Sequence, residues 1–371
     1  MGIVAVTGAS GFIGKNLMVR LGELGVEARA IGHDLNLEDM AVRLEGVDLV
    51  VHLAGVNRPQ TEDEFTLGNQ GMTERLVAAL TAVGGRVPLA YASSIQAERD
   101  NPYGRSKKAA EDAVAAYGSA TGAPVKIFRL PNVFGKWCRP NYNSVVATFC
   151  HNISRGLPIT ISDSNTMLRL VYVDDVVQRF VELAQDPSGT ANAAPVEPQY
   201  EISLGDLAMR LEGFRDSRES LVTGSVGTGL MRALHATYVS YLAPDNFDYP
   251  LVVHEDPRGR FVEMLRTPDS GQFSYFTAHP GITRGGHYHH SKTEKFLVVQ
   301  GTARFGFRHI LTSETFEIVT SGADSRVVET VPGWSHDITN IGDDTMVVML
   351  WANELFDRDR PDTIAAKVLT P

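Results

Sequence analysis

The hydrophobic positions in roughly the first 240 residues alternate between two spacings. A mostly apolar run covers residues 3–7, which is typical of a buried strand. Leu17, Leu21 and Leu24 then recur at the spacing of one helix face. Further strands are expected at 26–31, 47–53, 88–93 and 125–130, and further helices at 73–82 and 106–117. This repeated order of strand and helix predicts a parallel sheet wrapped by helices.

The last 125 or so residues follow a different pattern. Short runs rich in Val, Phe and Thr, such as 295–299 and 302–308, are separated by Gly, Asp, Asn, Ser and Pro. That pattern predicts an all-β sandwich or barrel. Segment 244–250 marks the passage between the two patterns. We therefore expect two domains, residues 1–243 and 244–371.

Three glycines follow the first expected strand directly and open the first expected helix. Gly8 would make a tight turn, Gly11 would let the backbone approach a pyrophosphate, and Gly14 would let helix and strand pack closely. The helix N-terminus then offers amide N–H groups and a favourable dipole to the phosphates. In this strand-to-helix context the motif favours a dinucleotide site over a purely structural loop.

A tyrosine and a lysine, Tyr103 and Lys107, lie four residues apart at the start of an expected helix, and therefore on one face. Ser94 ends the preceding strand, and in a parallel sheet that end faces the ligand crevice. A lysine beside a phenol favours the phenolate, so the tyrosine can act as an acid or base near neutral pH. The alternative is a surface Tyr–Lys pair on an exposed helix.

Together with the motif of residues 52–55, which begins with His52 after the third expected strand, these residues resemble the extended short-chain dehydrogenase/reductase family over roughly residues 1–240. That family acts mostly on nucleotide sugars. The resemblance implies an α/β Rossmann domain. It also implies that Ser94 holds the substrate oxygen and that Tyr103 donates the proton. Lys107 would hold the cofactor ribose and tune Tyr103.

The same resemblance implies the residues around the two ligands. Asn132 and residues 136–144 would line the sugar-nucleotide pocket. The expected cofactor contacts are Gly8, Ser10, Gly11, Phe12, Ile13, Gly14, His33, Asp34, Leu53, Ala54, Gly55, Tyr103 and Lys107. No carboxylate ends the second strand before Asp34, so we expect NADP(H), with His33 near a 2′-phosphate. A shift of two residues in the strand end would favour NAD instead.

Composition adds histidine to this picture and excludes other classes. Seven of the 11 histidines lie after residue 250, namely His254, His279, His287, His289, His290, His309 and His336. A net charge of −10 argues against nucleic-acid binding. Two cysteines exclude a disulfide scaffold. With no signal peptide or long apolar run, we expect a cytoplasmic protein that does not enter membranes.

Four of the C-terminal side chains have the spacing of a metal site. His287 and His289 alternate onto one face of an expected strand, and Glu294 can return from the next strand. His336 follows in a later segment. Three imidazoles and a carboxylate suit Zn²⁺ or another divalent transition metal. The alternatives are surface histidines, or a site of this kind that only packs.

These segments resemble the cupin superfamily, whose fold is a double-stranded β-helix jelly roll. Residues 256–261 and 284–287 are also similar to the deoxysugar 3,5-epimerases, which are metal-free cupins. There the histidine that corresponds to His287 is the catalytic base. We prefer His287 as a metal ligand, which leaves the base unassigned, with His290 and Lys295 as weak candidates.

The two parts together resemble the bifunctional UDP-sugar 3-epimerase/4-reductases of bacterial capsule and O-antigen synthesis (CapF type). That resemblance implies a homodimer and a UDP-sugar substrate, a 2-acetamido-2,6-dideoxy-4-hexulose. The cupin would epimerise C3, and the reductase would then reduce the C4 ketone with NADPH. One alternative is a single-activity reductase whose cupin only dimerises it. Another is a redox-sensing NADP(H)-binding protein, against which the intact Ser94, Tyr103 and Lys107 argue.

Overall fold

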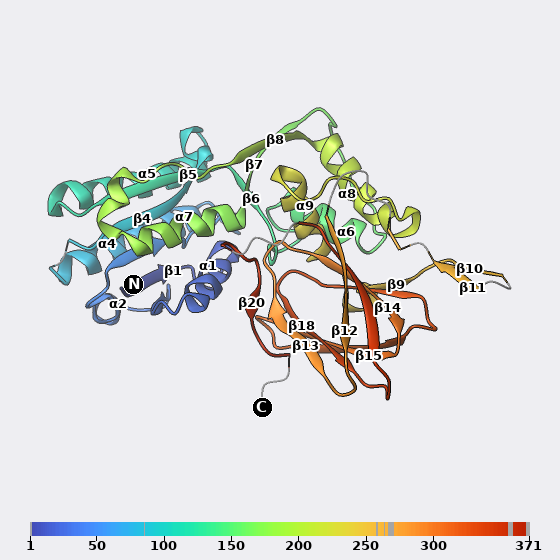
Figure 1. Ribbon diagram of the computed structural model, residues 1–371. Coiled ribbons are helices and arrows are strands. Elements are labelled where there is room, and N and C mark those ends of the chain that lie inside the picture. Colours follow the sequence, from blue (N-terminus) through green and yellow to red (C-terminus); the bar gives the residue numbers. More distant parts are fainter. Residues whose placement is uncertain are drawn as a thin grey trace. The chain divides into compact units, whose positions relative to one another are not determined.

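The computed structural model describes residues 2–84, 86–256, 259–262, 264–265, 271–354 and 359–368 (Figure 1). Part of segment 256–261, which carries the likeness to the 3,5-epimerases, lies outside these residues. Contacts divide the chain into two compact units. Unit 1 is Met1–Val145 with Met167–Ile202, and unit 2 is Val146–Thr166 with Ser203–Pro371.

Unit 1 is built on a five-stranded parallel sheet with the order β2-β1-β3-β4-β5 (Figure 1). The strands are β1 (Val4–Thr7), β2 (Ala28–Ile31), β3 (Leu49–His52), β4 (Leu89–Ser94) and β5 (Val125–Leu130). β1 and β3 are buried along their whole length, as their unbroken apolar runs predict. A small sheet adds β6 (Asn132–Phe134), β7 (Met167–Tyr172) and β8 (Gln199–Ser203).

Helices cover both faces of the parallel sheet (Figure 1). Successive side chains alternate between the faces, so Ala5 and Val50 join the core beneath α2, α4 and α5, and Val4 and Val6 point the other way. The helices are α1 (Phe12–Glu23), α2 (Leu37–Leu44), α3 (Asp63–Phe65), α4 (Met72–Ala82), α5 (Pro102–Thr121) and α7 (Val173–Gln185). The predicted helices at 73–82 and 106–117 lie within α4 and α5.

Unit 2 contains two five-stranded antiparallel sheets, with the orders β12-β19-β14-β17-β9 and β16-β15-β18-β13-β20. A separate hairpin pairs β10 (Val253–Asp256) with β11 (Gly259–Val262). The strands of the two sheets are β9 (Asp248–Pro250), β12 (Gln272–Ala278), β13 (Thr283–Tyr288), β14 (Glu294–Gln300), β15 (Thr302–His309), β16 (Thr315–Ser321), β17 (Arg326–Glu329), β18 (Trp334–Asn340), β19 (Met346–Ala352) and β20 (Ile364–Ala365). The predicted fold class, a Rossmann domain followed by an all-β cupin, is confirmed.

Three helices, α6 (Val145–Ile153), α8 (Leu204–Ser220) and α9 (Gly229–Val239), lie almost wholly in unit 2 with the β-sheets. The hydrogen bonds from the Ser154 hydroxyl and the Arg155 guanidinium to the Tyr241 carbonyl oxygen show how residues after α6 join this unit. The compact units therefore divide the chain differently from the predicted domains. The domain boundary between residues 243 and 244 stays a prediction from the sequence.

Candidate functional sites

The glycine-rich turn lies where the strand order reverses. The sheet order places β1 between β2 and β3, so the chain leaves β1 toward one side and returns on the other. Such a switch point forms a ligand crevice at the carboxyl ends of the strands. Thr7 ends β1, and its Oγ1 accepts hydrogen bonds from the amides of Leu53 (3.1 Å) and Ala54 (3.0 Å). These bonds tie the loops after β1 and β3 together at the crevice.

The first and last glycines of the motif have no room for a side chain. A Cβ on Gly8, which has a φ of +65°, would lie 2.7 Å from the Ala54 amide nitrogen. A Cβ on Gly14 would lie 2.1 Å from the Gly8 carbonyl oxygen. The Gly11 amide donates a 2.9 Å hydrogen bond to that same oxygen. Both steric reasons predicted from the sequence, the tight turn and the close helix packing, are therefore present.

His52 at the end of β3 braces the crevice from beneath. Its Nδ1 lies 2.6 Å from Thr7 Oγ1 and its Nε2 lies 2.8 Å from Thr73 Oγ1 on α4. Burial, together with the charge of Lys107, lowers the pKa of His52 to about 3. The ring is therefore neutral, with one nitrogen donating and the other accepting. The sequence places His52 in a family motif but does not reveal this bracing role.

Ser94 and Tyr103 come together at the end of β4 and the first turn of α5. Asn101 caps α5 by accepting a 2.8 Å hydrogen bond from the Gly104 amide, which fixes where Tyr103 leaves the helix. Burial raises the pKa of Tyr103, and a side-chain hydrogen bond with Ser94 opposes that rise. The phenol therefore stays protonated at neutral pH, which is the form that can donate a proton.

Lys107 lies one helical turn after Tyr103 and is almost completely buried. Its Nζ donates a 2.9 Å hydrogen bond to the Ala92 carbonyl oxygen and lies 4.4 Å from the centroid of the Tyr91 ring. A Cβ on Gly55 would lie 3.8 Å from this Nζ. Burial lowers the pKa of Lys107 to about 7. The predicted lysine therefore lies beside the loop after β3 that borders the crevice.

The turn after β2 is contacted by a cation, Arg75, that the sequence pattern did not indicate. His33 and Asp34 are both exposed in this turn. Arg75 on α4 donates hydrogen bonds to the carbonyl oxygens of His33 (3.2 Å) and Leu35. An arginine near this strand end can accommodate a ribose 2′-phosphate. Arg75 is therefore a second candidate contact to that phosphate, beside His33.

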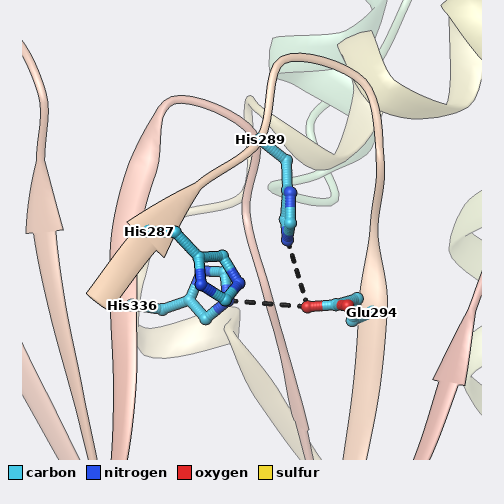
Figure 2. Close-up of side chains that lie close together, drawn as sticks. All are labelled: His287, His289, Glu294 and His336. Carbon is cyan, nitrogen blue, oxygen red and sulfur yellow. Dashed lines mark hydrogen bonds and ion pairs between the residues drawn. The ribbon is translucent and has the colours of Figure 1, made fainter. Parts of the chain in front are cut away.

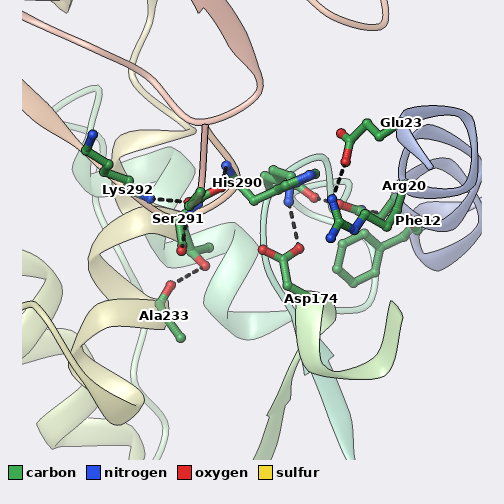
Figure 3. Close-up of polar contacts among 12 residues, drawn as sticks. Phe12, Arg20, Glu23, Asp174, Ala233, His290, Ser291 and Lys292 are labelled. Carbon is green, nitrogen blue, oxygen red and sulfur yellow. Dashed lines mark hydrogen bonds and ion pairs between the residues drawn. The ribbon is translucent and has the colours of Figure 1, made fainter. Parts of the chain in front are cut away.

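The segment expected to line the substrate pocket is anchored inside unit 1. Lys136 is buried, and its Nζ lies 2.7 Å from the carboxylate of Asp174 at the start of α7 (Figure 3). The Lys136 carbonyl oxygen accepts a 3.3 Å hydrogen bond from Asn16 on α1. Asn132 is exposed and donates to the Arg169 carbonyl oxygen at 3.1 Å. The start of segment 136–144 is therefore held between α1 and α7.

Four side chains of unit 2 converge on one point, as their spacing predicts (Figure 2). His287 lies on β13, His289 directly after it, Glu294 opens β14, and His336 lies on β18. One candidate ligand atom from each residue lies within 4.8 Å of all the others. The antiparallel register places His287 opposite His336, with ring centroids 4.7 Å apart.

The charges of this cluster suit a cation. Burial, together with His336 and His289, lowers the pKa of His287 to about 3, and burial also lowers the pKa of His336. Burial opposes the charge of Glu294, yet the imidazoles of His289 (3.1 Å) and His336 (3.5 Å) hold its pKa well below the usual range. Neutral imidazoles beside a carboxylate leave lone pairs available.

The donor set fits Zn²⁺ or a similar divalent transition metal. Tetrahedral bonds of about 2.0–2.1 Å need donor atoms roughly 3.3–3.5 Å apart. The observed spacing, within 4.8 Å, can reach this value through small side-chain adjustments. The clustering of His287 with the other three residues favours its interpretation as a ligand over that of a free base.

The structure does not support Lys295 as a base of this cluster. Glu294 and Lys295 are neighbours on β14, so their side chains point to opposite faces. Lys295 Nζ bonds the Glu329 carboxylate and, at 2.8 Å, the Tyr249 hydroxyl. Burial opposes its charge, but Glu329 raises the pKa of Lys295 above its ordinary value. Lys295 is therefore a protonated partner of Glu329.

Two residues of the turn after β13, His290 and Lys292, differ in whether they contact the cluster. The His290 ring lies 5.5 Å from the Tyr288 ring, on the alternate side of the chain from His287 and His289. Lys292 Nζ lies 2.8 Å from Glu294 Oε1, so this lysine contacts the cluster. Lys292 was not among the predicted site residues, because its spacing belongs to no metal or strand pattern.

A carboxylate far along the chain, Asp362, also reaches this turn. It accepts hydrogen bonds from the amides of His290, Ser291 and Lys292, and its own carbonyl oxygen bonds His289 Nδ1. Burial opposes the charge, but the nearby imidazoles and these amide donors lower the pKa of Asp362. Nothing in the sequence signalled this contact, which joins residues 73 positions apart.

Two family models match the chain. The model of the NAD dependent epimerase/dehydratase family matches residues 4–196, more than half of the sequence. The chain belongs to this family. A second model, the polysaccharide biosynthesis C-terminal domain, matches residues 254–364 and so covers most of the β-sheets of unit 2.

Relatives match over the full length of this family member. It is 57% identical over 366 residues to a UDP-2-acetamido-2,6-beta-L-arabino-hexul-4-ose reductase of Pseudomonas aeruginosa, covering 98% of both chains. The capsular polysaccharide assembling protein CapF from Staphylococcus aureus has a similar structure, with a TM-score of 0.67 and 41% identity over 99% of this chain and 100% of that one. A second structure, RMD from P. aeruginosa complexed with NADPH, has a TM-score of 0.50 and 23% identity over 58% of this chain and 81% of that one, and shares the fold.

These matches confirm the resemblance to CapF-type proteins that the sequence indicates. The chain is an enzyme of the NAD dependent epimerase/dehydratase family, with the additional C-terminal domain that the two full-length relatives share. In the described part of the chain, every helix is too short or too polar to cross a bilayer. The roles of individual site residues stay predictions.

Proposed function

We propose that this family member is a bifunctional enzyme acting on a UDP-2-acetamido-2,6-dideoxy-4-hexulose. Unit 2 epimerises C3, and the Rossmann site then reduces the C4 ketone to give UDP-2-acetamido-2,6-dideoxy-L-talose, a precursor of UDP-N-acetyl-L-fucosamine. The observation that carries this proposal is the presence of two separate sets of reactive side chains, one in each unit. The name of the P. aeruginosa relative supports a 4-keto UDP-sugar as substrate.

In the reduction, NADPH supplies the hydride to C4. Ser94 hydrogen-bonds the ketone oxygen, and Tyr103 gives that oxygen its proton. The raised pKa of Tyr103 keeps the phenol protonated until the substrate arrives. The positive charge of Lys107 favours the phenolate left behind, which lowers the cost of the proton transfer. Gly11 would let the cofactor phosphates approach the N-terminus of α1, while Gly8 and Gly14 allow the tight turn and the close packing of the helix.

We propose NADP(H) over NAD because His33 lies in the turn after β2 and the guanidinium of Arg75 on α4 contacts the same turn. The NADPH complex of a protein with the same fold supports the same choice.

In the epimerisation, the chain removes the C3 proton next to the ketone and returns one to the opposite face. His287, His289, Glu294 and His336 would hold the metal ion. A bound Zn²⁺ or similar ion would act as a Lewis acid toward the carbonyl oxygen. Reduction of the ketone removes the acidity at C3, so the second reaction prevents reversal of the first. This chemical order is a reason for both sites to occur on one chain. A homodimer and a cytoplasmic location stay predictions from the family resemblance.

The test separates the two activities. The 4-keto UDP-sugar is incubated with enzyme in deuterated water without NADPH, and deuterium at C3 is measured by NMR against a sample without enzyme. We expect exchange with the unmodified enzyme and with Tyr103→Phe, and none with His336→Ala. The rate of NADPH oxidation, in contrast, should fall on the order of 10²- to 10⁴-fold in Tyr103→Phe.

Two outcomes would contradict the proposal. Exchange that is unaffected by His336→Ala would contradict the role given to the cupin site, and no exchange with the unmodified enzyme would leave a single-activity reductase with a structural cupin. Loss of both activities in Tyr103→Phe would contradict the separation into two independent sites.

A further inference from the structure

One carboxylate accepts hydrogen bonds from three successive amides of the turn between the candidate metal ligands His289 and Glu294. Asp362 Oδ1 accepts a 2.8 Å hydrogen bond from the His290 amide, and Oδ2 accepts from the amides of Ser291 (2.7 Å) and Lys292 (2.8 Å). Oδ2 also accepts from the Ser291 hydroxyl at 3.1 Å (Figure 3 shows the turn). Three consecutive backbone amides therefore converge on one side chain, whose removal would leave all of them to find new partners.

The same residue also acts on a ligand directly. The Asp362 carbonyl oxygen bonds His289 Nδ1, and since a carbonyl can only accept, Nδ1 carries the proton. Nε2 of His289 faces the Glu294 carboxylate at 3.1 Å, and it would present its lone pair to a metal ion that replaced this hydrogen bond. A neutral imidazole that donates one N–H to a carbonyl and offers the other nitrogen to the site is the arrangement that metal-binding histidines use.

We propose that Asp362 is the positioning residue of the metal site. Its carboxylate clamps the turn between His289 and Glu294, and its carbonyl oxygen selects the His289 tautomer that binds metal through Nε2. This inference rests on the metal site proposed above. Other contacts to the turn, such as the 2.6 Å hydrogen bond from Arg232 to the Ser291 hydroxyl, hold the turn without touching the His289 ring.

The test measures metal affinity and tautomer separately. Zinc is titrated into the metal-free full-length enzyme, in competition with a chromophoric chelator, for the unmodified chain, Asp362→Asn and Asp362→Ala. The matched control is Asp343→Asn, an exposed carboxylate in the same unit. We expect zinc affinity to fall about 10- to 100-fold in both Asp362 variants and to be unchanged in the control.

The tautomer is read from the ¹⁵N chemical shifts of His289 in the metal-free unmodified enzyme, so this measurement does not depend on any variant folding. We expect a protonated Nδ1. An unprotonated Nδ1, or a change in zinc affinity of less than about threefold in Asp362→Ala, would overturn the proposal. If the unmodified enzyme bound no zinc, the metal site itself would be wrong. Tight binding by both the unmodified enzyme and Asp362→Ala would overturn the role of Asp362 alone.

Discussion

Lys107 in unit 1 and Lys295 in unit 2 are both almost completely buried, and their pKa values shift in opposite directions. Lys107 in unit 1 donates to a backbone carbonyl oxygen, and burial lowers its pKa to about 7. Lys295 in unit 2 is equally buried, but the Glu329 carboxylate raises its pKa above the ordinary value. Burial is therefore common to both, and the direct carboxylate partner decides the direction of the shift.

The difference separates a functional lysine from a structural one. A lysine whose pKa lies near 7 can change its charge when a phosphate-bearing cofactor arrives, and it lies beside the crevice. Lys295 instead belongs to a group of interacting side chains. Arg218 also contacts the Glu329 carboxylate, at 3.1 Å, and the Tyr249 hydroxyl accepts a hydrogen bond from Lys295. A perturbed pKa is therefore informative about function only together with the partner that causes it.

The largest effect should come from Lys107→Met. In the proposed mechanism, the change removes the cation that favours the Tyr103 phenolate and a contact to the cofactor ribose. We expect kcat/KM for NADPH oxidation to fall on the order of 10²- to 10⁴-fold, with C3 exchange in deuterated water unchanged. Steady-state kinetics and the exchange assay measure the two activities. A loss of less than about tenfold would mean that Lys107 is only a structural lysine like Lys295.

The matched variant, Lys295→Met, should affect stability instead of chemistry. Breaking a buried ion pair costs about 3–5 kcal/mol, and we expect a loss toward the lower end because Arg218 remains as a partner of Glu329. For a unit of this size the unfolding midpoint should fall on the order of 10 °C, while kcat of the folded enzyme stays near normal. The double variant Lys295→Met/Glu329→Leu should recover a large part of the loss. A reductase rate that fell together with stability would contradict the separation between the two lysines.

The sequence predicted most of the reductase site because its residues obey short-range rules. Tyr103 and Lys107 share a helix face, and the glycine spacing follows from one turn. The metal cluster was also predictable, since His287, His289 and Glu294 lie within eight consecutive residues. His52 was recognised only as part of a motif, and Lys292, Arg75 and Asp362 were missed altogether. Arg75 and Asp362 act across 42 and 73 residues, through tertiary contacts that leave no periodic trace.

A smaller effect concerns pH. Because burial lowers the pKa of Lys107 to about 7 in the cofactor-free chain, its charge is present below that pH and is lost above it. The kcat/KM for NADPH, which reports the free enzyme, should therefore decline about tenfold per pH unit above roughly pH 7. A profile from pH 5.5 to 9 in one ionic strength checks this. A flat profile between pH 6 and 9 would show that the positive charge of Lys107 is not needed.

The smallest effect separates the tyrosines beside the two lysines. The Tyr249 hydroxyl accepts a 2.8 Å hydrogen bond from Lys295, so Tyr249→Phe should destabilise the enzyme by about 1–2 kcal/mol. The Tyr91 hydroxyl is buried and has no hydrogen-bond partner among the described residues, and Lys107 contacts only the Tyr91 ring. Tyr91→Phe keeps the ring and removes an unsatisfied hydroxyl, so stability should stay within about 0.5 kcal/mol or rise slightly. Denaturant unfolding of both variants measures the difference. The comparison depends on a hydrogen-bonded hydroxyl beside Lys295 and only an aromatic face beside Lys107. If Tyr91→Phe lowered the free energy of unfolding as much as Tyr249→Phe, the surroundings of the two lysines would be more alike than their contacts indicate.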